Sequence, residues 1–141
     1  MFKIIVSGHG EFASAIEKTL EYIIGKQENI DYINFNNGMG IKELEERYIE
    51  SVLKNEDRET LFLTDLAGGT PFSTAVTLSQ SMKDIYVLGG INIPTILAAI
   101  EYRDQESLEK TVGDIINHGK ESIVTFQKKE LNDNFQNDDG I

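Results

Sequence analysis

The chain has 141 residues, a formal net charge of −11 and no cysteine. The length suits one domain with a single core, and the lack of cysteine excludes disulfides, zinc–thiolate sites and thiol catalysis. The acidic balance, 24 acidic against 13 basic residues, argues against nucleic acid or anionic lipid as a partner, because both need a positive surface. The same balance would suit a basic protein partner.

The beginning of the sequence shows no targeting segment. Met1 leads directly into an apolar, strand-like run without a basic region or a cleavage site. No apolar run approaches the ~18 residues that a membrane-spanning helix needs. We therefore expect a cytoplasmic protein.

Five short β-rich runs alternate with helical patterns. We predict strands at residues 3–7, 30–35, 61–65, 85–88 and 122–126. The first, third and fourth are nearly continuous in apolar residues, which is typical of central strands covered on both faces. The fifth is short and follows a helical pattern, so we predict that it is an edge strand.

Apolar residues at helical spacing predict helices within residues 12–24, 41–53, 72–82, 97–100 and 108–116, with Gly25 just after the first and Pro71 in the first turn of the third. This alternation predicts an α/β fold: a doubly wound, mainly parallel sheet of about five strands with helices on both faces. The strand order that we expect is 2-1-3-4 plus a C-terminal edge strand. We expect the domain to cover residues 1–126. Residues 127–141 are polar and acidic, and we expect them to form a mobile tail.

His9 is the most informative residue of the chain. It lies between Gly8 and Gly10, directly after a predicted strand and before a predicted helix. The glycines remove side-chain cover and let another molecule approach closely. Imidazole combines nucleophilicity with a pKa near neutrality, so this pattern predicts a reactive histidine presented to a partner.

A second loop follows the third predicted strand and contains Asp65, Gly68, Gly69, Thr70, Pro71 and Phe72. With the strand order 2-1-3-4, this loop and the His9 loop flank the same crevice, where open α/β sheets bind ligands. Asp65 would then accept a hydrogen bond from one imidazole nitrogen and leave the other free to attack. A helix that begins after glycines is an anion site, and the Thr70 hydroxyl would cap the helix or donate to phosphate.

Other chemistries lack the residues that they need. The site loops contain no lysine and no Walker-type sequence, which argues against direct use of ATP. A metal site would lack ligands, because the chain has two histidines and no carboxylate cluster near His9. The second histidine, His118, lies at a predicted helix end, where it is expected only to interact with the last carbonyls and the helix dipole.

The segments around His9 and from Thr64 to Phe72, together with Gly90-Ile91-Asn92-Ile93-Pro94, resemble the enzyme IIA component of the mannose family of the bacterial phosphotransferase system. The resemblance covers residues 1–126. It implies a phosphotransferase without a cofactor, in which phospho-HPr phosphorylates His9 on Nε2 and a histidine of a IIB component then accepts the phosphoryl group. The IIB component phosphorylates sugar that enters through the membrane components IIC and IID.

The same resemblance implies roles for the remaining site residues. Asp65 would support His9. Gly68, Gly69, Thr70 and Phe72 would bind the phosphoryl group, and Gly8, Gly10 and Asn92 would line the site. Residues 36–40 would at most line it as well. The family is usually a homodimer that exchanges its last strand. Some members fuse IIA to IIB through a linker rich in alanine and proline, whereas this chain would be freestanding.

Three alternatives stay open from the sequence. A phosphoryl-donor subunit of dihydroxyacetone kinase would share the fold and the histidine, but we expect serine or another small residue in place of Gly10. A histidine phosphatase would surround the histidine with arginines, and Arg47, Arg58 and Arg103 are all distant from His9 in sequence. The third alternative is a non-catalytic, flavodoxin-like binding module in which His9 only contacts a ligand.

Overall fold

The computed structural model describes residues 1–54 and 59–129, and within them strands and helices alternate along the chain. The elements are β1 (Lys3–His9), α1 (Phe12–Ile24), β2 (Ile30–Phe35), α2 (Ile41–Leu53), β3 (Thr60–Thr64), α3 (Thr70–Ser81), β4 (Ile85–Gly89), α4 (Ile93–Tyr102) and α5 (Leu108–Glu121). Most predicted bounds are confirmed to within one or two residues. The fourth helix begins four residues earlier than predicted, at Ile93, and α5 extends five residues further, to Glu121.

The four strands form one parallel sheet in the order β2-β1-β3-β4, which confirms the predicted order 2-1-3-4. The register places Ser7 of β1 beside Ile33 of β2 and Thr64 of β3. Consequently the carboxyl ends of β1 and β3 are neighbours at one edge of the sheet. The loops that follow these two strands leave the sheet side by side.

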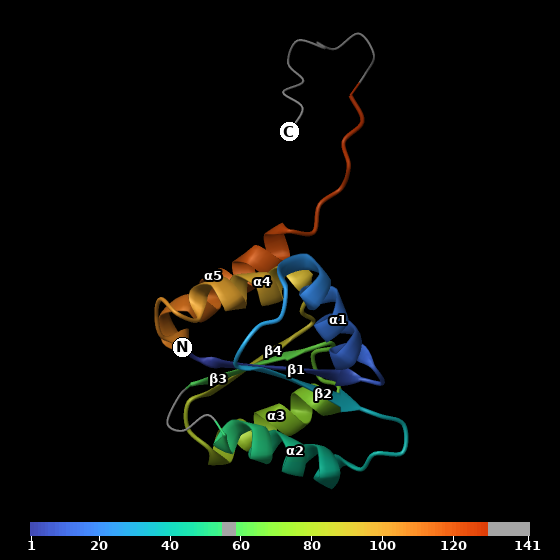
Figure 1. The fold of residues 1–141 in the computed structure, drawn as a ribbon, viewed down its shortest axis with the longest axis vertical. Coiled ribbons are helices and arrows are strands. Elements are labelled where there is room, and N and C mark those ends of the chain that lie inside the picture. The colour runs from blue at the N-terminus through green and yellow to red at the C-terminus, as the bar shows by residue number, and fades with distance from the viewer. Residues whose placement is uncertain (55–58, 130–141) are drawn as a thin grey trace.

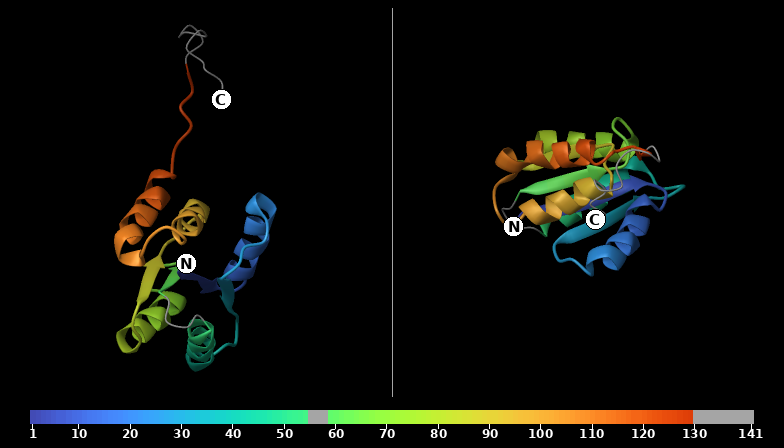
Figure 2. Two further views of the ribbon diagram at one scale, coloured as in Figure 1. Left: turned by 60° about the vertical axis from the view of Figure 1, so that its left-hand side comes forward. Right: turned by 90° about the horizontal axis from the view of Figure 1, so that it is seen from above.

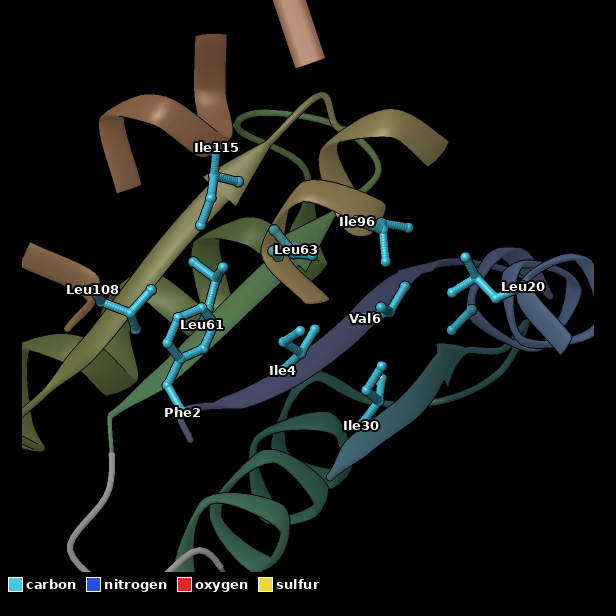
Figure 3. Close-up of a cluster of buried hydrophobic side chains, with 12 residues drawn as sticks. Phe2, Ile4, Val6, Leu20, Ile30, Leu61, Leu63, Ile96, Leu108 and Ile115 are labelled. Atoms are coloured by element: carbon cyan, nitrogen blue, oxygen red, sulfur yellow. The ribbon is translucent and has the colours of Figure 1, made fainter. Parts of the chain in front are cut away.

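Helices cover both faces of the sheet (Figures 1 and 2). Alternation along β1 sends Ile4 and Val6 to one face, where they pack with residues of α1, α4 and α5 in an apolar cluster (Figure 3). Ile5 points to the other face and packs against α2 and α3, together with Ile33 and Phe62. By the same alternation, Ser7 and His9 belong to the face that α2 and α3 cover.

The predicted fifth strand is absent from the sheet of this chain. The helix α5 ends at Glu121 with Ser122 as its C-cap, and residues 123–129 leave the domain in an extended path (Figure 1). Ile123, Val124 and Phe126 are 78%, 81% and 87% exposed. The β-rich run that predicted a strand is therefore present, but among the described residues none pairs with it. Residues 130–141 of the predicted tail lie outside the described residues.

The prediction that residues 85–88 form a central strand is also wrong for the single chain. β4 is an edge strand, and all five of its residues are only partly buried, whereas β1 and β3 are covered on both sides. β4 lies at the outside of the sheet because residues 122–126, the predicted fifth strand, do not pair with it. Among the described residues, no helix has the length and apolar content needed to cross a membrane.

Candidate active site

His9 ends β1 and Asp65 directly follows β3, and the adjacency of the two strands brings these residues together. His9 Nδ1 lies 2.9 Å from Asp65 Oδ2. The same carboxylate oxygen accepts the His9 backbone N–H at 2.9 Å. An ionised carboxylate can only accept a hydrogen bond, so this contact favours the tautomer with the proton on Nδ1 and a free lone pair on Nε2. The His9 side chain is 45% exposed, so the ring is accessible to another molecule.

Two of the predicted glycines are required by close approach. A Cβ at Gly8 would lie 2.5 Å from Phe12 Cδ2 and 2.9 Å from Asp65 Cγ. A Cβ at Gly69 would lie 2.7 Å from His9 Cε1 and 3.4 Å from Nε2. The imidazole therefore occupies the space in which a side chain at position 69 would stand, and its Nε2 edge faces the start of α3.

The start of α3 has free backbone donors. The Gly69 N–H donates to Leu66 O at 3.1 Å, and Pro71 has no N–H. Among the described residues, no hydrogen-bond acceptor is recorded for the amides of Thr70 and Phe72, and the N-cap residue Gly69 provides no capping side chain. A helix start with unsatisfied amides attracts anions. These amides follow Gly69, the residue that packs against the imidazole.

The other predicted residues are placed as follows. Gly10 has a φ of +59° and Gly68 a φ of +82°, so both adopt a backbone conformation that favours glycine. The side chain of Asn92, which the sequence placed in the site lining, is engaged at the junction of α4 and α5. Its Oδ1 accepts from Thr95 N at 3.0 Å, and its Nδ2 donates to Gly119 O at 3.0 Å.

Sequence reasoning missed the contribution of β2 to the site. The Phe35 ring meets the His9 ring edge-on at a centroid distance of 6.1 Å. The Gly10 N–H donates to Phe35 O at 2.8 Å. One residue earlier, Asn34 Oδ1 accepts from Ser14 N at 3.0 Å and thereby caps α1, which follows His9. The expected strand order could have indicated this contribution, because it places β2 and β3 on the two sides of β1, and the end of β2 therefore lies beside His9.

Two further observations concern the chemistry of the site. Asp65 Oδ1 is buried and has no hydrogen-bond partner among the described residues, so Oδ2 alone makes the contacts of this carboxylate. Across the described ranges, no group of three or more His, Cys, Asp or Glu side chains is arranged to hold a metal ion.

His118 lies in the last turn of α5, and its ring is 6.0 Å from that of Tyr102.

Comparison with known proteins places this geometry in a family. Residues 3–116 match the family model EIIA-man, described as "PTS system fructose IIA component". The chain belongs to this enzyme IIA family of the phosphotransferase system. It is accordingly an EIIA component of sugar uptake, and such components work as phosphoryl carriers together with HPr and IIB partners.

Individual EIIA relatives support the same assignment. The fructose-specific EIIA component of Bacillus subtilis is 33% identical over 117 residues, which are 82% of this chain and 80% of the relative. The mannose-specific EIIAB component of Escherichia coli K12 is 30% identical over 91% of this chain, but the match spans only 40% of that longer protein. A crystal structure of EIIA from Streptococcus agalactiae has a TM-score of 0.84 and 37% identity, covering 89% of this chain and 98% of that one.

Proposed function

We propose that His9 carries the phosphoryl group on Nε2, accepting it from phospho-HPr and passing it to a IIB component during sugar uptake. The observation that carries the proposal is the contact of 2.9 Å between His9 Nδ1 and Asp65 Oδ2. This contact favours the proton on Nδ1 and so supports the Nε2 lone pair as the nucleophile. The ring is also exposed enough for a partner protein to reach it.

In the proposed transfer, the Nε2 lone pair attacks phosphorus while the P–N bond of phospho-HPr breaks. The departing histidine of HPr keeps the electron pair of the broken bond. The Nδ1 proton stays on His9, and Asp65 stabilises the positive charge that develops on the ring. The second transfer, to IIB, repeats these steps with His9 as the leaving group. Because both bonds are phosphorus–nitrogen bonds to imidazole, no nucleotide is needed.

The start of α3 is proposed to hold the phosphoryl oxygens. The free N–H groups of Thr70 and Phe72 and the Thr70 hydroxyl are the donors for this role, and the absence of a side chain at Gly69 lets the group approach them. The positive end of the helix dipole would stabilise the charge on the equatorial oxygens in the transition state. Gly8, Gly10 and Gly68 complete the walls of the proposed site.

We also propose a homodimer in which residues 122–126 pair with β4 of a second copy. Their large side chains are exposed, and the outer edge of β4 pairs with no strand among the described residues. An apolar pocket of about 350 Å³ lies beside this edge, lined among others by Leu88, Ile91, Ile116 and Ile123. Light scattering should find a dimer at micromolar concentration and a monomer after deletion of residues 122–141. A wild-type monomer under these conditions would exclude this assembly.

The carrier role is tested by incubating the protein with phosphoenolpyruvate, enzyme I and HPr. Wild type should gain one acid-labile phosphate per chain, and His9→Ala should gain none. His118→Ala is the matched control, since it removes the second histidine of the chain and should behave as wild type. Phosphate on the His9→Ala protein, or labelling with ATP alone, would overturn the proposal.

A further inference from the structure

A buried hydroxyl lies between the two parts of the candidate site, which are β1 with His9 and the first turn of α3. Tyr48 is on α2, has no exposed surface, and packs in the apolar cluster that contains Phe62, with a distance of 4.8 Å between the two ring centroids. Burial raises the pKa of its hydroxyl, so the group remains a protonated donor. A hydroxyl in such surroundings destabilises the fold unless it is hydrogen-bonded. Its partners therefore define what it does.

The Tyr48 hydroxyl contacts one segment from each part of the site. It donates to Ser7 Oγ at 2.6 Å and toward Pro71 O at 3.2 Å. Ser7 Oγ in turn donates to Ile33 O at 2.7 Å. One phenolic proton is thus shared between β1 and the first turn of α3, and a second hydroxyl extends the network to β2.

The positions of these partners connect the network to the chemistry. Ser7 lies two residues before His9 on the same face of β1. The hydrogen bonds of Ser7 therefore hold the end of the strand that carries the imidazole. Pro71 lies between Thr70 and Phe72, whose amides are the free donors at the start of α3. A shift of α3 along the sheet would move these donors relative to Nε2. The Tyr48 network joins the two segments that such a shift would separate.

We propose that Tyr48 is a positioning residue for phosphoryl transfer, whose hydroxyl, together with Ser7, fixes the first turn of α3 relative to His9. The inference rests on the proposed carrier function and extends it. Among the described residues, the Tyr48 hydroxyl bonds to Ser7 and Pro71 and forms no hydrogen bond to His9, so it acts through the alignment of the helix start. An apolar residue of the same shape would fill the core equally well but would leave α3 free to slide.

Tyr48→Phe tests this role, because it removes the hydroxyl and keeps the ring. The transfer rate from phospho-HPr should fall roughly tenfold to a hundredfold, as expected when reacting groups are misaligned by a fraction of an ångström to about 1 Å. The fall should be in kcat and not in KM for HPr, since Tyr48 is absent from the surface. The final yield should stay at one phosphate per chain, which separates slow transfer from partial unfolding.

Two further variants sharpen the test. Ser7→Ala removes the other hydroxyl of the network and should slow transfer similarly, and the double variant should be no slower than the slower single one, since both act through one network. Ser51→Ala is the control. It also removes a buried, hydrogen-bonded hydroxyl of α2, but one that donates to Asp31 of β2 and, among the described residues, forms no hydrogen bond to β1 or α3. It should transfer at the wild-type rate.

The outcomes separate the two proposals. Wild-type rates in folded Tyr48→Phe and Ser7→Ala proteins would overturn the positioning role while leaving His9 as the carrier. A comparable loss of rate in Ser51→Ala would also overturn it, because any weakening of α2 would then suffice. A wild-type protein that gains no phosphate from phospho-HPr would overturn the carrier function, and the positioning role with it.

Discussion

Two neighbouring loops of this domain lead into helices whose first turns differ in capping. The β3–α3 loop, residues 65–69, and the β4–α4 loop, residues 90–92, leave adjacent parallel strands at the same edge, and each leads into a helix with a proline in its first turn. The start of α4 is closed by a capping box in which the side chains of Asn92 and Thr95 satisfy each other's backbone N–H groups. The start of α3 has no capping side chain.

The two helix starts at the C-terminal ends of the strands therefore differ in what their backbone N–H groups can do. A capped helix start contributes about 1 kcal/mol of stability, and at α4 this capping is combined with a bond from Asn92 to Gly119 O of α5. At α3 the amides of Thr70 and Phe72 have no acceptor among the described residues, and the imidazole of His9 lies against Gly69. The uncapped helix start is therefore the better candidate for anion binding, although both loops contain glycine and lead into a helix with a proline in its first turn.

The largest effect is expected from Asp65, at the beginning of the uncapped loop. Asp65→Ala removes the acceptor of both the Nδ1–H and the backbone N–H of His9. Transfer from phospho-HPr should fall on the order of a thousandfold or more, because the tautomer and the ring orientation are no longer fixed. Single-turnover labelling with phospho-HPr measures the rate, and circular dichroism checks the fold. Unchanged transfer in a folded variant would remove Asp65 from the mechanism.

Gly69→Ala tests whether the imidazole needs the space at the start of α3. The added methyl group would stand 2.7 Å from His9 Cε1, so the ring must move. We expect transfer to fall roughly a hundredfold, with little change in thermal stability, since position 69 has an extended backbone that alanine also adopts. Crystallography of the variant would locate the ring. A ring in its original place with normal transfer would contradict the steric argument.

Asn92→Ala is the reciprocal change in the capped loop. It removes the cap of α4 and the bond to α5, so the free energy of unfolding should fall by about 1–2 kcal/mol. Phosphoryl transfer at a temperature where the variant is folded should remain at the wild-type rate. Urea denaturation and labelling are measured on the same preparation. A large loss of transfer without a loss of stability would return Asn92 to the site lining that its sequence position suggested.

The smallest effect is expected at the opposite end of the sheet, away from both loops. Burial raises the pKa of Asp31, but hydrogen bonds from Lys3 and Ser51 outweigh this effect, so the net pKa is lowered. A lowered folded pKa means that the pair stabilises the fold above the unfolded pKa of about 3.9 and loses this contribution as pH falls below it. The loss should stay below about 1 kcal/mol, because Asp31 is partly exposed.

Lys3→Met should raise the Asp31 pKa and flatten the dependence of stability on pH below about 4. Carboxyl titration by nuclear magnetic resonance measures the pKa directly. Phosphoryl transfer at neutral pH should not change. A titration of Asp31 that is the same in both proteins would show that Lys3 does not hold the carboxylate.

The sequence predicted the elements that depend on local periodicity. Alternating strands and helices indicated a parallel sheet, and the expected order 2-1-3-4, which the structure has, placed His9 beside Asp65. The contacts that the sequence did not predict are those between distant elements. Tyr48 is one apolar-stripe residue among several on α2, and nothing local indicates that its hydroxyl reaches both Ser7 and Pro71.

Two other differences have physical reasons of their own. Asn92 lies in a motif beside the site loops, but the direction of its side chain depends on where α5 ends, which periodicity does not report. Residues 122–126 have the pattern of a strand. Such a pattern indicates that the segment pairs with another strand, but it does not indicate whether that strand belongs to the same chain or to another molecule. β4 was expected to be central for the same reason.

The exposed segment after α5 has a kinetic consequence. Four parallel strands are joined within one chain, so that part of the sheet can form at a rate independent of protein concentration. In the proposed dimer, the side chains of Ile123, Val124 and Phe126 become buried only when a second molecule arrives. The last phase of refolding would then be bimolecular and would accelerate as the protein is concentrated. The melting temperature would rise with concentration for the same reason.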